Sequence, residues 1–164
     1  MNDHVATLVQ RYRSRGVLVD TNILLLFFVG SFDRNLISRF KRTERYTPGD
    51  FDLLIRLLTR FDRMVTTPNI LSEVNGLSAQ LGEPAKTAYF QHFSETIGLI
   101  AETYVVSAEA AKLDHFPKLG LTDSGIVQLV KGKYLVLTDD FPLSGFLADA
   151  GIDALNFNHL RQIF

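Results

Sequence analysis

The chain has 164 residues, of which 46% are hydrophobic and 21% are charged, so it can fill the core of one folded domain and is not a disordered chain. Its net charge of −1 excludes binding to nucleic acid through bulk positive charge, which leaves a local basic patch or metal ions as the means of binding a polyanion. The absence of cysteine excludes disulfide bonds and thiolate zinc sites, and it fits a reducing compartment.

The most apolar stretch of the chain, residues 23–29, is too short to cross a bilayer, which takes about 20 residues. Three arginines between residues 11 and 15 precede it and give this part of the chain some likeness to a signal peptide. However, Asp20 and Asn22 interrupt the apolar region, and no small-residue cleavage site follows. We therefore expect a soluble, cytoplasmic protein that has no membrane partner.

The first expected element is a short buried strand at residues 16–20, which ends in a carboxylate. The chain then loses its regular pattern, and we interpret residues 31–49 as an insertion that is both basic and aromatic. A helix is expected at residues 51–61, where apolar side chains recur at helical spacing, with Gly49 or Asp50 at its start. The insertion contains Arg34, Arg39, Lys41, Arg42 and Arg45, interleaved with Phe32, Phe40 and Tyr46.

Short β-rich runs alternate with segments of helical length through the rest of the chain. Further strands are expected at residues 64–67, 103–106, 134–138 and 153–156, and further helices at residues 69–81, 84–101, 122–130, 142–150 and 158–164. Thr122 is the expected N-cap of the helix at residues 122–130, and Gly151 is the expected C′ residue of the helix at residues 142–150. This alternation predicts a single domain spanning residues 1–164, with a three-layer α/β/α sandwich around a central parallel sheet of four to five short strands.

Acidic residues occur where strands of this sheet end or where helices begin. Asp20 ends the first strand, Asp139 and Asp140 follow the fourth, and Glu73 and Asp123 lie near the starts of two helices. An open parallel sheet binds ligands at the carboxyl ends of its strands, so we expect these side chains to meet there. Each residue alone is typical of a turn, a helix cap or a solvated helix face, and only their joint placement predicts a site.

Several carboxylates at one edge raise each other's pKa values and destabilise the fold unless a cation screens them. Mg²⁺ is a hard cation that prefers oxygen ligands, and it can activate water and neutralise the charge that develops on a phosphodiester. An imidazole-rich zinc site is a poorer fit because the histidines are scattered. They are His4, His92, His115 and His159.

Four segments resemble, in the same order, the acidic motifs of the PIN domain family. They are Val17-Leu18-Val19-Asp20-Thr21-Asn22, Thr67-Pro68-Asn69-Ile70-Leu71-Ser72-Glu73-Val74, Leu121-Thr122-Asp123-Ser124 and Leu137-Thr138-Asp139-Asp140-Phe141. The resemblance extends over nearly the whole chain, and it implies a parallel sheet flanked by helices, a Mg²⁺ or Mn²⁺ site and cleavage of single-stranded or structured RNA. Many members are toxins, so an antitoxin protein and a homodimer are further implied partners, although compact toxins have a shorter interval between the first two motifs.

The resemblance also implies roles for particular residues. The expected catalytic residues are Asp20, Glu73, Asp123 and Asp140. Three of them, Asp20, Asp123 and Asp140, are expected to hold the metal, while Glu73 completes the site or orients the attacking water and Asp139 shares or replaces the role of Asp140. The residues that match carboxylate-positioning residues of the family are Thr21, Asn22 and Thr138.

The basic residues of the insertion have two interpretations. They could line the route of an RNA strand, with phosphates on the basic side chains and bases stacked on aromatic rings. The side chains concerned are Arg39, Lys41, Arg42 and Arg45. The alternative, which we prefer, is a solvated loop whose aromatic side chains anchor it to the core.

The function expected from these observations is that of a divalent-metal-dependent endoribonuclease, which in one form would be the toxin of a toxin–antitoxin pair. The first alternative is a PIN-like module with weak or no activity that binds RNA or a protein partner. The second is a phosphatase that uses the same carboxylates with Mg²⁺. Its usual nucleophile has a second Asp two residues on, which is absent from Asp20-Thr21-Asn22.

Overall fold

Five short parallel strands form one sheet in the computed structural model, which describes residues 3–163. The strands are β1 (Val17–Val19), β2 (Met64–Thr66), β3 (Ala101–Glu102), β4 (Leu135–Thr138) and β5 (Ala154–Asn156), in the order β3-β2-β1-β4-β5 across the sheet. Strand β1 is central, and Leu18 pairs with Val65 of β2 on one side and with Val136 of β4 on the other. All three residues of β1 are fully buried, so both faces of the sheet need a cover of helices.

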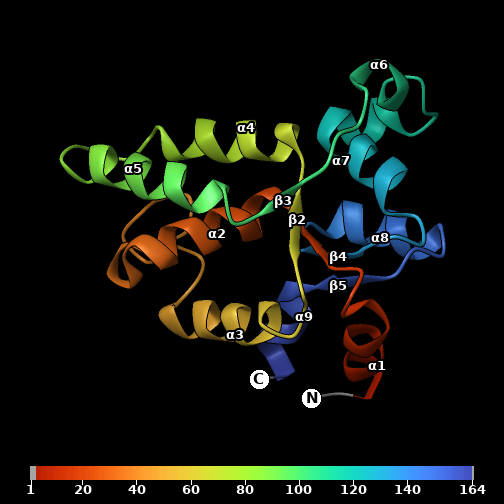
Figure 1. Cartoon of the computed structure of the whole chain (residues 1–164), viewed down its shortest axis with the longest axis horizontal. Coiled ribbons are helices and arrows are strands. Elements are labelled where there is room, and N and C mark those ends of the chain that lie inside the picture. Colours follow the sequence, from red (N-terminus) through yellow and green to blue (C-terminus); the bar gives the residue numbers. More distant parts are fainter. Residues whose placement is uncertain (1–2, 164) are drawn as a thin grey trace.

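Helices provide this cover on both faces (Figure 1). They are α1 (Asp3–Tyr12), α2 (Thr21–Phe32), α3 (Pro48–Leu58), α4 (Pro68–Ser78), α5 (Ala85–Ile97), α6 (Ser107–Ala110), α7 (Phe116–Val130), α8 (Phe141–Asp149) and α9 (Phe157–Ile163), with a short 3₁₀ helix η1 (Arg34–Leu36) after α2. Right-handed crossovers put the helices that lead to β2 and β3 on one face and those that lead to β4 and β5 on the other. Figure 1 shows α2 to α5 and α6 to α8 on opposite sides of strand β2. The expected three-layer α/β/α sandwich with a parallel sheet is confirmed.

Helix α2 is the main element that the sequence pattern did not predict. Its N-cap is Asp20, whose side chain accepts a hydrogen bond from the backbone N–H of Thr21. Most of the helix is buried, so apolar side chains occur on every face and the periodicity of a half-exposed helix is absent. Between residues 3 and 163, no helix combines the length and the apolar character needed to cross a membrane.

Two further helices, α1 and α6, were also not predicted, and other boundaries shift where caps set them. Helix α3 begins at Pro48 rather than at Gly49 or Asp50, because Thr47 and Asp50 form a reciprocal capping box. After α8, Gly151 has the positive φ of 67° expected of a C′ residue. The last expected helix is α9, and Phe164 lies outside the described residues.

The expected strand at residues 103–106 is wrong, because β3 ends at Glu102. Only the N–H of Thr103 extends the pairing, by donating to the carbonyl of Thr66. The chain then leaves the sheet, and Tyr104 is 71% exposed. The β-forming residues at this place predicted a strand, but among the described residues no strand pairs with them beyond Thr103.

Helix α7 begins earlier than expected and is broken at Gly120, whose φ of 77° and ψ of −175° are not helical. Glycine adopts this positive φ without the steric penalty that a side chain would bring. Thr122 therefore lies inside the second part of the helix, so its expected role as an N-cap is wrong. The break determines how the second part of α7 approaches the carboxyl edge of the sheet.

The segment between α2 and α3 is shorter than the expected insertion at residues 31–49, because its ends belong to these two helices. Phe40 and Tyr46 are buried, with 6% and 1% of their surface exposed. The hydroxyl of Thr43 is also buried and donates to the carbonyl of Ile37. This is the arrangement of the anchored-loop interpretation, with the basic side chains of the segment left exposed.

Candidate functional site

The topological switch point of the sheet lies between β1 and β4. The chain goes from β1 to β2 on one side, whereas the later crossover from β3 brings it to β4 on the other side. The crevice outside the strand ends at such a point is where open α/β sheets bind ligands. Asp20 directly follows β1 here, and Asp139 and Asp140 directly follow β4.

The four acidic residues expected to be catalytic line one open cavity of about 320 Å³ at this switch point. Asp20 and Asp140 come from the starts of α2 and α8, Glu73 comes from α4, and Asp123 comes from α7. The other residues that line this acidic cavity are Thr21, Asn22, Leu77, Leu119, Gly120, Leu121 and Thr122. None of the lining residues is a lysine or an arginine, so no cationic side chain within the cavity neutralises its carboxylates.

Asp20 is held in a fixed orientation at the base of this site. Its Oδ1 accepts a hydrogen bond from the backbone N of Thr21 at 2.7 Å, and its Oδ2 accepts one from Oγ1 of Thr138 at 2.6 Å. The pKa of Asp20 is raised to about 6, chiefly by burial; these two hydrogen bonds lower it in part, and the carboxylates of Asp139 and Asp140 add to the rise. The surroundings of Asp20 therefore disfavour its negative charge.

The hydroxyl of Thr138 connects Asp20 with Asp140. Besides donating to Asp20, this hydroxyl accepts a hydrogen bond from the backbone N of Asp140 at 2.9 Å. Asp140 is the N-cap of α8, and its Oδ1 accepts a hydrogen bond from the backbone N of Leu143 at 2.7 Å. Within residues 3–163 its Oδ2 accepts no hydrogen bond, so this oxygen is free to bind a ligand.

Two threonine hydroxyls orient Glu73. Oγ1 of Thr21 donates to Oε2 at 2.7 Å, and Oγ1 of Thr122 donates to Oε1 at 2.5 Å. These contacts connect α4 with the start of α2 and with α7. The contact of Thr122 was missed in the sequence, because a threonine near a helix start is most often a cap residue and no sequence signal indicates its distant partner.

Asp123 is the carboxylate of this site that has no side-chain partner within residues 3–163. Its side chain is partly buried, and in the described part of the chain it accepts no hydrogen bond and forms no ion pair. Burial raises its pKa to about 7, and the carboxylates of Asp20, Asp140 and Glu73 raise it as well. A partly buried carboxylate next to other carboxylates, with no partner among the described residues, is the arrangement that a bound cation would stabilise.

Asp139 faces other partners, and it does not line the acidic cavity. It is 4% exposed, and its Oδ2 accepts a hydrogen bond from the hydroxyl of Tyr46 at 2.5 Å. The same oxygen forms an ion pair with Arg45 at 2.6 Å, while Oδ1 accepts a hydrogen bond from Nδ2 of Asn22 at 3.2 Å. Of the two adjacent aspartates, Asp140 is therefore the one that faces the cavity.

The donor set of the acidic cavity fits a hard divalent cation in its chemistry, because its side chains offer carboxylate, hydroxyl and amide oxygens. Asp123, which has no partner in the described part of the chain, supports this fit. The spacing is wider than that of a closed ligand group, since no three acidic or histidine side chains of residues 3–163 lie close enough together to hold a metal ion. Mg²⁺ often uses only one or two carboxylates and completes its coordination with waters and substrate oxygens.

Comparison with protein-family models, with curated proteins and with solved structures found no match to this chain.

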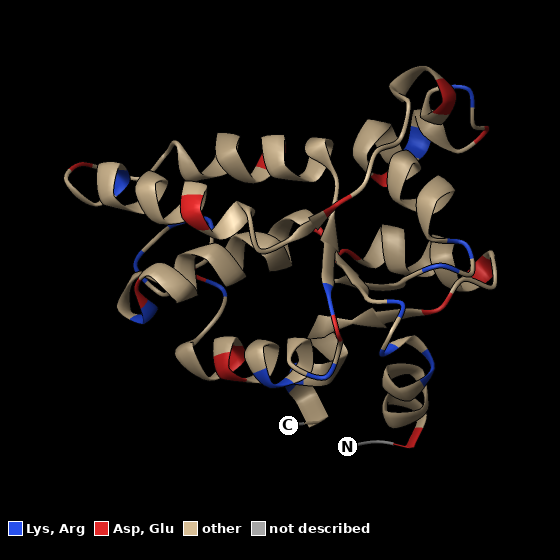
Figure 2. Ribbon diagram, in the orientation of Figure 1, with Lys and Arg blue, Asp and Glu red and all other residues tan. Residues whose placement is uncertain are grey.

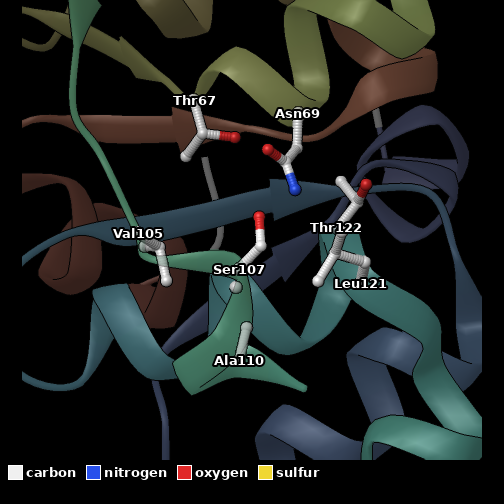
Figure 3. A pocket seen from close by; sticks show the side chains of 8 residues that line it. Thr67, Asn69, Val105, Ser107, Ala110, Leu121 and Thr122 are labelled. Atoms are coloured by element: carbon white, nitrogen blue, oxygen red, sulfur yellow. The ribbon is translucent and has the colours of Figure 1, made fainter.

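A smaller hollow lies next to the acidic cavity and shares Leu121 and Thr122 with it. Figure 3 shows this hollow with the side chains of Thr67, Asn69 and Ser107 around it. Its free space of about 10 Å³ is enough for about one water molecule. The acidic cavity is large enough for a cation with its waters and a phosphate group, so it is the candidate active site.

Proposed function

We propose that this chain is a divalent-metal-dependent endoribonuclease of the PIN type, which hydrolyses RNA phosphodiester bonds. The observation that carries the proposal is the convergence of four carboxylates from four separate segments on one cavity at the switch point of the sheet. Asp123 has no partner within residues 3–163, and the carboxylates of the cavity repel one another; both observations support a cation as the ligand of this cavity.

Each residue has a distinct role in this proposal. Asp20, Asp123 and Asp140 would hold Mg²⁺ or Mn²⁺, and Thr138 holds the first and the last of these in place. A metal bound there supplies an activated water and neutralises the charge that develops on the phosphodiester. Glu73, whose two oxygens are oriented by threonine hydroxyls, would accept a hydrogen bond from the attacking water and direct it.

A second candidate is a PIN-like module that binds RNA or a protein partner without cutting. The observation that favours it is the open spacing of the carboxylates, because the part of the chain that the structure describes contains no closed metal-ligand group. The two candidates differ in what they predict for RNA in the presence of a divalent ion. The nuclease cleaves it, whereas the binding module leaves it intact.

The test is incubation of the purified protein with end-labelled RNA in Mn²⁺ or Mg²⁺, with EDTA as the metal-free control. We expect cleavage that EDTA abolishes and that Asp123→Asn slows by roughly 10²-fold or more, because the variant loses a charged ligand. Asp149→Asn is the matched control, because it removes the same charge from an exposed residue outside the cavity. Equal cleavage by Asp123→Asn and the unchanged protein would contradict the assignment, and intact RNA that stays bound would favour the second candidate.

A further inference from the structure

A second open cavity, of about 300 Å³, adjoins the acidic one. It is lined by Lys41, Arg42, Glu44, Arg45, Asn22 and Leu77, and the last two residues also line the acidic cavity. Figure 2 shows lysine and arginine positions along the chain between α2 and α3, which supplies all the charged residues of this lining. Three cationic side chains against one carboxylate make this second cavity basic.

Arg45 is held at this cavity by the buried carboxylate of Asp139. The two side chains form an ion pair of 2.6 Å, in which the side chain of Asp139 is 1% exposed and the side chain of Arg45 is 52% exposed. The guanidinium carbon of Arg45 also lies 5.0 Å from the centre of the Tyr46 ring, within the range of a cation–π contact. A guanidinium has five N–H donors, so donors remain for an anion after the bond to Asp139 is made.

The other two cations of the cavity are less constrained. Arg42 donates a hydrogen bond from Nε to Oε1 of Gln80, which leaves its charge without a carboxylate partner among the described residues. Lys41 is exposed and forms no ion pair within the same part of the chain. Arg39 is exposed as well, but it does not line this cavity.

We propose that the basic cavity is a subsite for the RNA backbone, in which Lys41, Arg42 and Arg45 bind phosphates next to the phosphodiester that enters the acidic cavity. Asp139 acts as a positioning residue that holds Arg45 in this subsite, rather than as a metal ligand. The inference rests on the proposed nuclease function. Phosphate binding by these cations compensates for the repulsion that an RNA strand meets at the neighbouring carboxylates.

The first test measures binding of a fluorescent single-stranded oligoribonucleotide of about 12 nucleotides by anisotropy, in EDTA and over a range of salt concentrations. We expect Lys41→Ala and Arg42→Ala each to weaken binding about three- to ten-fold and to reduce the slope of log K against log salt by about 0.7. Lys131→Ala is the matched control, since Lys131 is exposed at the end of α7, before β4, and lies outside both cavities. Unchanged slopes in both cavity variants, or no binding by the unchanged protein, would overturn the subsite.

The second test concerns the positioning role of Asp139. Arg45→Ala should weaken RNA binding several-fold, and Arg45→Lys should weaken it less, because lysine keeps the charge but loses the planar fork of donors. As a single substitution, Asp139→Asn should weaken RNA binding. Added to Arg45→Ala, it should cause no further loss of binding. Additive losses in the double variant would overturn the positioning role.

These measurements separate the subsite from the nuclease itself. EDTA prevents metal-dependent cleavage, so the binding result does not depend on catalysis. If Asp123→Asn abolishes cleavage while Lys41→Ala and Arg42→Ala leave RNA binding unchanged, the nuclease stands and the subsite is overturned. If the basic variants lose RNA binding and no divalent ion supports cleavage, the subsite stands and the nuclease proposal fails.

Discussion

Ionisation of Asp123 costs the folded chain stability, because burial and three neighbouring carboxylates raise its pKa to about 7. In the unfolded chain the same carboxyl group has its ordinary pKa of 3.8. Between about pH 4 and pH 7 the folded state therefore binds more protons than the unfolded state, and the free energy of unfolding falls as pH rises. Asp20, with a pKa of about 6, contributes in the same direction between about pH 4 and pH 6.

Asp123→Asn should remove the part of this pH-dependent fall in the free energy of unfolding that comes from Asp123. In EDTA at pH 8 we expect the variant to be more stable than the unchanged protein by about 1–2 kcal/mol, after allowance for solvent screening of a partly exposed group. At pH 4 the two proteins should have nearly equal free energies of unfolding. Urea denaturation at a series of pH values measures the difference, with Asp149→Asn as the control. Parallel pH profiles for Asp123→Asn and the unchanged protein would show that Asp123 is not in the environment described.

The two adjacent aspartates show what a local pattern cannot distinguish. Asp139 and Asp140 both follow β4, and either could have been the cavity residue on sequence grounds. Asp140 caps α8, which directs it to the cavity side, whereas Asp139 bonds to Tyr46 and Arg45 from a segment more than 90 residues away. These long-range contacts decide between the two residues, and they depend on how the segment between α2 and α3 packs.

At the scale of elements, α2 and α3 approach each other closely at Gly30. A Cβ built at Gly30 would lie 2.3 Å from a ring carbon of Phe51, closer than two carbon atoms can approach without a shift of one of them. Phe51 is itself buried, and the guanidinium of Arg34 lies over its ring, so the ring has little room to move. Glycine is needed here for packing rather than for an unusual φ angle.

Gly30→Ala should destabilise the protein by roughly 1–3 kcal/mol, because the cost of overpacking exceeds the gain of alanine in helix propensity. Gly76→Ala in α4 is the matched control, since a Cβ built there meets no atom of residues 3–163 within 4 Å apart from its chain neighbours and the nearby backbone of its own helix. That variant should gain up to about 1 kcal/mol. Thermal or urea unfolding of both variants gives the comparison. A Gly30→Ala variant as stable as Gly76→Ala would mean that the two helices do not pack as described.

The break in α7 is a second element-scale feature that serves the site. Gly120 interrupts the helix, and the part that follows presents Asp123 to the cavity and Thr122 to Glu73. The apolar spacing after Thr122 was enough to predict a helix there. It contained no information about the preceding turns, because a positive φ at one glycine changes the helix direction without changing the residue pattern.

At the scale of the whole molecule, the fold brings like charges together at one edge of the sheet. Folding therefore works against this repulsion unless a cation is bound. Stabilisation by a ligand that binds only the folded state is RT ln(1 + [L]/Kd), which is about 2.7 kcal/mol when the ligand is at 100 times its Kd. Metal binding should thus be visible as a change in stability, independently of any catalytic assay.

Millimolar Mn²⁺ or Mg²⁺ should raise the thermal unfolding midpoint of the unchanged protein at pH 7.5, and EDTA should reverse the rise. We expect a much smaller rise for Asp123→Asn, because it lacks a charged ligand, and the full rise for Asp149→Asn. Differential scanning fluorimetry across a metal titration measures these shifts. The prediction fails if Asp123→Asn responds to the metal as strongly as the unchanged protein does.

The sequence by itself determined the alternation of strands and helices, and hence the parallel three-layer architecture. It also placed Asp20 and Asp140 at the ends of strands, because strand ends and helix caps depend on neighbouring residues. Only the tertiary structure decided that α2 is a mostly buried helix, that Thr122 bonds to Glu73 and that Asp139 bonds to Arg45. Apolar side chains on every face of a mostly buried helix remove the periodicity that identifies it. Contacts between distant segments depend on how the elements pack, which no local pattern of residues contains.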